Sequence, residues 1–339
     1  MCGCAYTPPP IYTDHADLMY RLDDAGGRHA VESVADWRIR RDHILGAMQL
    51  VMGQHPCPAK LVPLEPEISE EVHGEVWTRQ KLTFASELGD RVPAYLFIPD
   101  GVAAPGPAML CLHQTTAIGK SEPAGLGGLE NLHYARELAE RGFVTLAPDY
   151  PGYGDYQIDA YALGYVAATM KGIWNHERAV DLLASLDEVD ARRIGVIGHS
   201  LGGHNSLFVA AFDERLRCAV TSCGFNSFAQ YKGGDLTGWS HEGYMPRIAE
   251  EYGCDPARMP FDFTEVLGAI APRAVFVNAP TGDSNFELSG VIDCLDAARP
   301  VYDLYDAGER LVAVHPDCGH DFPPEVRETA YAFVAEALG

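Results

Sequence analysis

Short apolar runs alternate with amphipathic stretches from about residue 72 to the end of the chain. The runs predict strands at 72–84, 92–98, 108–113, 143–147, 194–198, 218–223, 274–278 and 311–315. Helical spacing of apolar residues predicts helices at about 130–141, 163–187, 201–212, 285–299 and 325–338. Because the later strands are apolar throughout, both faces of their sheet must be covered. The pattern predicts an α/β fold, with a mostly parallel eight-stranded sheet and helices on both faces.

The first 71 residues lack the strand–helix alternation of the rest of the chain. They predict an N-terminal arm and a helical leader that packs on the core. Residues 1–11 predict a loose arm that stops at three consecutive prolines. Residues 12–54 predict two helices broken at Gly26-Gly27, the second opening with a capping pattern of Ser33 and Asp36. Residues 55–71 are rich in proline and predict a segment that crosses the surface. The remaining residues, 72–339, form the predicted catalytic domain.

About fifty residues separate the apolar run that ends at Cys223 from the one that begins at Ala274. A connection of this length inside a domain is usually functional, and this one leaves the carboxyl end of a predicted strand, where ligands bind in open α/β sheets. We therefore predict that 224–268 is a lid-like insertion or a pocket wall. Its aromatic residues Tyr231, Trp239 and Tyr244 are candidates for lining the substrate pocket. The alternative is a peripheral insertion that only packs.

Composition and charge narrow the classes of partner. The chain has 339 residues, and its 25 Lys+Arg against 48 Asp+Glu give a formal net charge of −23. Such a surface repels phosphate backbones and anionic lipid, so we expect neither nucleic-acid nor membrane-surface binding. The nine cysteines are scattered without zinc-site spacing, and we expect no metal and no cofactor. With no predicted signal peptide or membrane span, we expect a cytoplasmic protein with reduced thiols.

A candidate nucleophile lies at the junction of a predicted buried strand and an apolar helix. The run Gly198-His199-Ser200-Leu201-Gly202 has the pattern G-x-S-x-G at such a junction. The glycines permit a tight, strained turn that lifts the serine hydroxyl above the sheet, and the helix points its first N–H groups at developing negative charge. The alternative is a glycine-rich turn in which Ser200 only caps the helix.

A serine nucleophile needs a base and an orienting carboxylate from later in the chain. His320 lies in a loop before the last predicted helix and is preferred to His315, which ends a strand. Asp283 follows the strand before that and is preferred to Asp293 and Asp296, which lie in a helical pattern. The predicted triad is therefore Ser200, Asp283 and His320.

An oxyanion hole needs two N–H donors, one of which is predicted to be that of Leu201. The other should come from the loop after the strand at 108–113, where the sequence reads His113-Gln114-Thr115. With this loop, Ser200, Asp283 and His320 in order, residues 72–339 resemble the α/β-hydrolase superfamily, close to its dienelactone-hydrolase-like and acetyl-xylan-esterase-like branch. The resemblance implies a structural role for His113. Gln114 stands where the family has glycine, so either Gln114 or Thr115 could supply the donor.

The favoured hypothesis is a serine esterase that cleaves short-chain acyl or acetyl esters of small molecules through an acyl-enzyme. Two alternatives are a peptidase of the prolyl-oligopeptidase type, which shares the catalytic domain, and a non-catalytic binding module on the same fold. A homodimer is compatible with the sequence, although nothing in it requires one.

Overall fold

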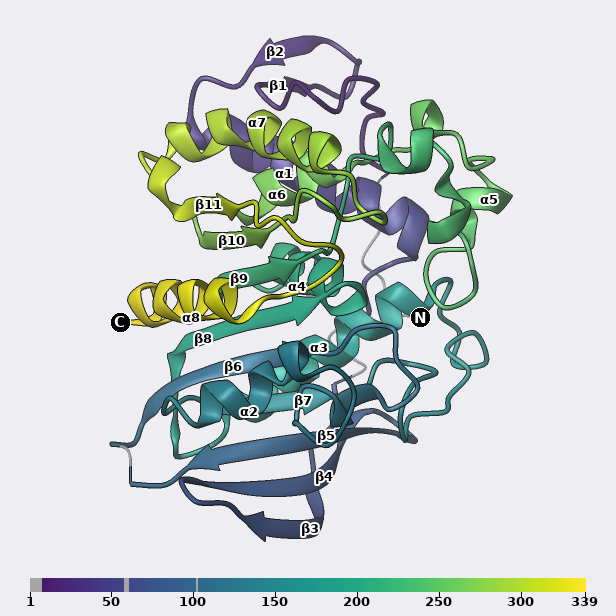
Figure 1. Ribbon diagram of the computed structural model, residues 1–339. Helices are drawn as coiled ribbons and strands as arrows, with labels where there is room; N and C mark the ends of the chain where they lie inside the picture. The colour runs from purple at the N-terminus through teal and green to yellow at the C-terminus, as the bar shows by residue number, and fades with distance from the viewer. Residues whose placement is uncertain (1–7, 58–60, 102) are drawn as a thin grey trace. The chain divides into compact units, whose positions relative to one another are not determined.

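Stretches of chain that are far apart in sequence assemble each of two structural units (Figure 1). The computed structural model describes residues 8–57, 61–101 and 103–339. Unit 1 comprises the described residues through His55 together with Ala160–Met170 and Phe225–His320. Unit 2 comprises the described residues of Pro56–Asp159 together with Lys171–Gly224 and Asp321–Gly339. No helix of the described residues is long and apolar enough to span a membrane.

Unit 2 is built on a mixed sheet whose strands lie in the order β9-β8-β6-β7-β5-β4-β3. Its strands are β3 (Glu67–His73), β4 (Trp77–Glu87), β5 (Asp90–Pro99), β6 (Gly106–Leu112), β7 (Val144–Pro148), β8 (Val189–His199) and β9 (Leu216–Ser222). The neighbours from β9 to β7 are parallel, whereas β7, β5, β4 and β3 pair antiparallel. The carboxyl ends of the central parallel strands therefore meet at one edge, where the site residues of this unit follow them.

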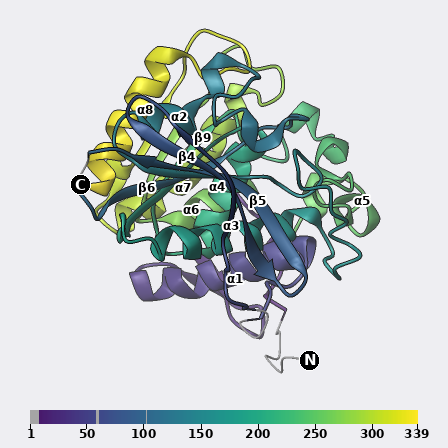
Figure 2. The ribbon, with the colours of Figure 1, turned by 90° about the horizontal axis from the view of Figure 1, so that it is seen from below.

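Helices cover both faces of this sheet, as the buried strands require. They are α2 (Tyr134–Ala139), α3 (Ala168–Ala184), α4 (Leu201–Phe212) and α8 (Pro324–Leu338). Helices α2 and α8 lie on one face, and α3 and α4 lie on the other (Figure 2). Every residue of α4 from Leu201 to Ala211 is buried, so this helix is held firmly where it follows Ser200.

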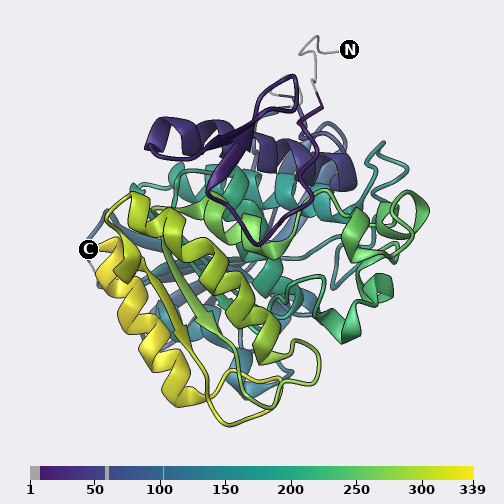
Figure 3. The ribbon, with the colours of Figure 1, turned by 90° about the horizontal axis from the view of Figure 1, so that it is seen from above.

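Unit 1 contains a parallel pair of strands and a group of helices (Figure 3). Its elements are β1 (Tyr20–Leu22), β2 (Arg28–Ala30), α1 (Val34–Met52), α5 (Arg247–Glu250), α6 (Phe263–Ile270), β10 (Ala274–Asn278), α7 (Leu288–Leu304) and β11 (Leu311–Val314). A buried ion pair joins Arg40 of α1 to Glu265 of α6, and Glu265 also bonds to His15 at 2.8 Å. Burial alone would lower the pKa of His15, but the neighbouring Glu265 carboxylate raises it overall. Charged groups thus fix the leader to the insertion inside this unit.

The predicted helix before Gly26-Gly27 is wrong, because β1 and β2 form an antiparallel hairpin there. The carboxylate of Asp23 accepts hydrogen bonds from the backbone N–H groups of Ala25 (3.0 Å) and Gly27 (2.7 Å). Gly26 has a φ of 81°, which favours glycine. The two glycines therefore close a hairpin and do not separate two helices.

Strand β3 was not expected, because it occupies part of the segment predicted to cross the surface at 55–71. All its residues are exposed, and it pairs only with β4 at the edge of the sheet. An exposed edge strand needs no apolar alternation, so its run of charged residues hid it. The eight predicted strands therefore did not include β3.

Cys57 is disulfide-bonded, so the expectation of fully reduced thiols is wrong for that residue. Cys2 and Cys4 lie outside the described residues.

Candidate active site

Ser200 sits in a strained turn between β8 and α4 of unit 2. Its backbone has φ 54° and ψ −115°, a conformation that costs an L-residue energy and is usually kept at functional sites. The surrounding structure imposes it: the N–H of Ser200 donates to the carbonyl of Ser222 on β9 at 2.8 Å, and the carbonyl of Ser200 accepts from His204. Ser200 is half-buried at the N-terminus of α4. The strained turn holds the serine hydroxyl in position for attack, and the helix N-terminus stabilises the negative charge that develops there during the reaction.

Two glycines make this turn sterically feasible. A Cβ added to Gly198 would overlap the backbone of Gly202, and a Cβ added to Gly202 would overlap the carbonyl oxygen of Leu112 at the end of β6. The first turn of α4 therefore lies directly against the end of β6. This close approach brings the N–H of Leu201 to the same edge of the sheet as the loop that follows β6.

We expect Gly202→Ala to destabilise the protein by about 1–3 kcal/mol, because the added methyl group would collide with backbone that cannot move aside. Gly106→Ala is a matched control, since its Cβ would meet its nearest atom at 3.5 Å. The free energy of unfolding, measured by chemical denaturation, should fall for the first variant and change little for the second. Equal stability of the two variants would contradict the close packing of the turn.

The loop after β6 is held by buried polar groups. Nδ1 of His113 lies 2.6 Å from the carbonyl of Gln114, and Nε2 accepts from the N–H of Tyr150 at 2.9 Å. Burial lowers the pKa of His113, which suits a neutral ring that donates through Nδ1 and accepts through Nε2. The side-chain amide of Gln114 donates to Glu122 at 3.1 Å, and Thr115 is exposed. Backbone contacts thus occupy both nitrogens of His113, whereas the choice of Gln114 or Thr115 as oxyanion donor stays a prediction.

A buried lysine ties this loop to the turn after β7. The ammonium of Lys120 lies 2.6 Å from Asp149 and 2.8 Å from Asp155, and the backbone N–H of Lys120 also donates to Asp149. Hydrogen bonds from Lys120 and Lys81 lower the pKa of Asp155 to about 2. Lys120 and Asp149 are both buried, so their charges neutralise each other inside the protein. Asp149 is accordingly engaged in a structural ion pair.

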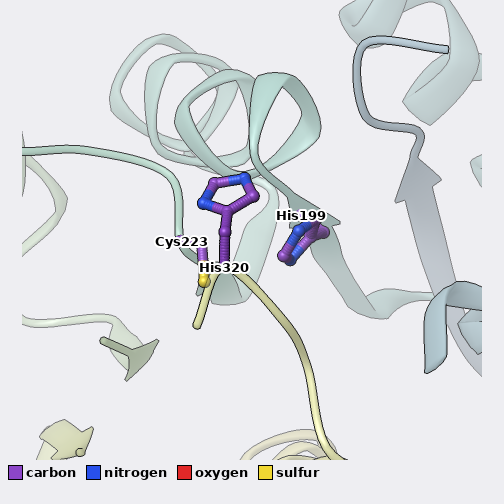
Figure 4. A group of neighbouring side chains, drawn as sticks. All are labelled: His199, Cys223 and His320. Atoms are coloured by element: carbon purple, nitrogen blue, oxygen red, sulfur yellow. The ribbon is translucent and has the colours of Figure 1, made fainter. Parts of the chain in front are cut away.

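Two possible metal ligands lie beside Ser200 in unit 2: His199, which ends β8, and Cys223, which follows β9 (Figure 4). Both are buried, and Nδ1 of His199 lies 2.9 Å from the hydroxyl of Ser222. Within unit 2, His199 and Cys223 provide two ligand atoms, one nitrogen and one sulfur, whereas a structural zinc site uses four ligands. His320, drawn in the same view, belongs to unit 1.

Asp283 and His320 form a hydrogen-bonded pair within unit 1. Nδ1 of His320 lies 2.9 and 3.0 Å from the two carboxylate oxygens of Asp283. Burial alone would raise the pKa of Asp283, but the hydrogen bond from His320 and those from the backbone of Asn285 and Phe286 lower it overall. The carboxylate therefore stays ionised, fixes the imidazole tautomer with hydrogen on Nδ1 and leaves Nε2 as the base.

The rival residues have other partners. Nδ1 of His315 lies 3.0 Å from the carbonyl of Ala279. The carboxylate of Asp293 accepts from Gln230 at 3.2 Å, and Asp296 is exposed on α7. Among the candidates considered, Asp283 is therefore the carboxylate that bonds to His320 within this unit.

The insertion residues Tyr231, Trp239 and Tyr244 belong to one aromatic cluster in unit 1. The rings of Tyr231 and Trp239 lie 5.8 and 5.9 Å from that of Phe286, which itself lies 5.9 Å from His320. Tyr231 and Trp239 are buried among these rings, whereas Tyr244 is partly exposed. The cluster packs the insertion toward the Asp283–His320 pair, and contact with substrate stays a prediction.

Two neighbours of the predicted residues were missed from the sequence. Glu122 is buried and accepts from both the Gln114 side chain and the N–H of Leu129. Phe286 packs beside His320. Neither has a sequence signal of its own, apart from lying shortly after a predicted site residue.

The predicted site residues divide between the units. Ser200, Leu201, Gln114 and Thr115 lie in unit 2, and Asp283, His320 and the three aromatic residues lie in unit 1. The approach of Ser200 to His320 therefore stays a prediction, supported by the sequence order and by the local geometry on each side.

The strand order, the strained serine turn and the later Asp–His pair are those of the α/β-hydrolase fold. A sequence model of the family described as "Glucuronyl esterase, fungi" matches residues 153–306. A glucuronoyl esterase from Solibacter usitatus superposes with a TM-score of 0.75 at 19% identity, covering 98% of this chain and 99% of that one. A carbohydrate esterase family 15 glucuronoyl esterase from Caldicellulosiruptor kristjansonii gives 0.71 at 19% identity, covering 98% and 92%. These structural likenesses confirm the α/β-hydrolase fold.

Curated relatives include "Putative hydrolase YtaP" of Bacillus subtilis (strain 168), 26% identical over 74% of this chain and 84% of that protein. Another is the 2,6-dihydropseudooxynicotine hydrolase of Paenarthrobacter nicotinovorans, 29% identical over 48% of this chain and 38% of that protein. The match thus spans less than half of the length of this second relative. Together, the matches support a carboxylic ester hydrolase.

Proposed function

We propose that this carboxylic ester hydrolase works through a triad of Ser200, His320 and Asp283 on short-chain acyl esters, sugar esters among them. The strained strand–turn–helix conformation of Ser200 carries the proposal, because such strain persists where a hydroxyl must be held exposed above a sheet. The pairing of His320 with an ionised Asp283 supplies a base of the right tautomer. The sugar esters are suggested by the glucuronoyl esterases to which the chain is similar.

The reaction would proceed in two halves. Ser200 Oγ attacks the ester carbonyl carbon while Nε2 of His320 takes its proton, and the oxyanion is met by the N–H of Leu201 and one from Gln114 or Thr115. Collapse of this intermediate breaks the bond to the alcohol, which leaves with the proton from His320. A water molecule then attacks the acyl-enzyme, with His320 again taking and returning a proton, and the acid is released. A small-molecule ester is the proposed partner, and the cytoplasm is the proposed location.

The proposal is tested by substrate preference and by active-site labelling. We expect hydrolysis of nitrophenyl acetate, acetylated xylose or methyl glucuronate, and a fluorophosphonate probe attached to Ser200 in the peptide map. A peptide nitroanilide should be cleaved far more slowly than the esters.

Two results would contradict this function. Faster cleavage of the peptide amide than of any ester would favour the prolyl-oligopeptidase-like alternative. Failure of both labelling and hydrolysis, in a protein shown to be folded by its cooperative melting, would favour the binding module.

A further inference from the structure

Glu122 is a buried carboxylate in the loop after β6, and the reaction described above gives it no part. It follows the short 3₁₀ helix η2 (Gly119–Ser121) and is 2% exposed. Its Oε1 accepts hydrogen bonds from the side-chain amide of Gln114 and from the N–H of Leu129, each at 3.1 Å. Its Oε2 is buried and has no hydrogen-bond partner among the described residues. Because a buried carboxylate with an unpaired oxygen costs stability, packing alone does not account for Glu122.

The start of this loop lies against the serine turn within unit 2. In the parallel pair of β6 and β8, Leu112 is opposite Gly198, so Gln114 and the proposed nucleophile each follow that pair by two residues (Figure 1). A Cβ added to Gly202 would also lie 2.9 Å from the carbonyl oxygen of His113, so the first turn of α4 packs on the backbone just before Gln114. The Gln114 side chain therefore begins beside the proposed oxyanion donors.

The side chain of Gln114 is an addition to this loop, because the α/β-hydrolases that the sequence resembles have glycine there. Its carbonyl oxygen is a good hydrogen-bond acceptor. A free side chain could turn this oxygen to the N–H of Leu201 and occupy the donor that the substrate oxygen needs. The bond to Glu122 opposes this, because an ionised carboxylate only accepts and so holds the amide nitrogen of Gln114 toward itself.

Neighbouring groups hold Glu122 itself in place. Lys120, two residues earlier, is buried in its ion pair with Asp149. The N–H of Glu122 donates to the carbonyl of Gly119 at 3.2 Å. A Cβ added to Gly128 would overlap Oε1 of Glu122, so the returning loop lies directly on the carboxylate. Glu122 is thus a fixed acceptor, as is needed to restrain a flexible side chain.

We propose that Glu122 is a positioning residue of the esterase, which holds the Gln114 side chain away from the oxyanion hole and leaves the backbone N–H groups there open to substrate. This inference rests on the proposed function, because it gives Glu122 a part in that reaction. Since Glu122 is buried, it acts through Gln114 and touches no reacting atom. Its loss should weaken the transition state, in which the oxyanion forms, more than substrate binding.

The test is Glu122→Met, which removes both acceptor oxygens and keeps a side chain of similar size. With nitrophenyl acetate we expect kcat to fall about 10- to 100-fold, while KM stays within about threefold of the wild type. Glu122→Gln keeps an acceptor oxygen for the same two N–H groups and should recover most of the lost kcat. Glu130→Met makes the same replacement at an exposed position of the same loop and should leave kcat unchanged.

A second replacement separates this role from a merely structural one. Gln114→Ala removes the group that Glu122 restrains, so adding Glu122→Met to Gln114→Ala should lower kcat by no more than about threefold further. If Glu122 only stabilises the loop, for example through Leu129, the fall in kcat should be equally large with and without the Gln114 amide. That result would overturn the proposal.

Gln114→Asn keeps the proposal testable if Glu122→Met does not melt cooperatively. The shorter side chain cannot reach Glu122 in the same way but still has a carbonyl oxygen. Its kcat should therefore lie about tenfold below that of Gln114→Ala. Equal kcat values for these two variants at Gln114 would contradict the proposal.

A crystal structure of Glu122→Met, or of Gln114→Asn in its place, gives a readout that does not need hydrolysis. We expect the carbonyl oxygen of the side chain at 114 to lie within hydrogen-bond distance of the N–H of Leu201. A side chain that stays in place or turns into solvent would overturn the proposal. If the wild type hydrolyses no ester and takes up no fluorophosphonate, the proposed function fails, and this side-chain position still decides the role of Glu122.

Discussion

Ser200→Ala should abolish ester hydrolysis, with kcat falling on the order of 10⁶-fold. The reason is chemical: without Oγ there is no atom to form the acyl-enzyme, and the remaining oxyanion donors can assist only a direct attack by water. The backbone of this turn should tolerate the change, since alanine and serine have similar steric demands at a φ of 54°. We therefore expect the variant to melt cooperatively at a temperature close to that of the wild type. The measurement is the initial rate with nitrophenyl acetate, together with loss of fluorophosphonate labelling.

Ser185→Ala is the matched control for this experiment. Ser185 follows α3 in unit 2, is exposed, and its hydroxyl donates to the carbonyl of Leu182. Its replacement removes a serine hydroxyl without touching the turn at β8, so activity and labelling should persist. If Ser200→Ala kept more than a small fraction of wild-type turnover while folded, Ser200 would not be the nucleophile. The site would then have to be sought elsewhere in the molecule.

The parts of the fold that could be predicted from sequence are those that burial dictates. The apolar run before Ser200 and the apolar helix after it are β8 and α4, and α4 has the predicted bounds of 201–212. The start of α1 was also predictable, because Ser33 caps it by accepting a hydrogen bond from the N–H of Asp36. In both cases a local pattern and the tertiary packing require the same conformation.

The elements that escaped prediction depend on features without periodicity. Strand β3 is exposed and charged, and only its pairing with β4 makes it a strand. The β1–β2 hairpin depends on one carboxylate, that of Asp23, which caps a two-glycine turn. Likewise, Phe286 was missed because its position beside His320 arises from tertiary packing within unit 1. The pairing of Asp283 with His320 was thus predictable from residue type and order, whereas the contacts that support it required coordinates.

Asp283→Asn should lower kcat by roughly 10⁴-fold with nitrophenyl acetate, while Asp296→Asn should leave it within a factor of two to three, roughly, of the wild type. The carboxylate of Asp283 accepts from His320 Nδ1–H, whereas an amide can offer its own N–H there and stabilise the tautomer that cannot act as a base toward Ser200. Asp296 carries the same charge on the exposed surface of α7, so its variant controls for the loss of a negative charge. A greater loss of activity for Asp296→Asn than for Asp283→Asn would show that Asp283 is not the residue that orients His320.

The same pair predicts a pH dependence of stability with a definite sign. Because the pKa of Asp283 in the folded protein is lower than its ordinary value of 3.8, the ionised pair stabilises the fold fully above that value. This stabilisation is lost as the pH falls through the lower pKa of the folded state, where the carboxylate takes up a proton. An asparagine cannot ionise, so the difference in unfolding free energy between wild type and Asp283→Asn should be constant at neutral pH and shrink in acid. Parallel denaturation curves for the two proteins at pH 7 and in acid measure this difference, and an unchanged gap would mean that the Asp283 carboxylate is not held ionised by His320.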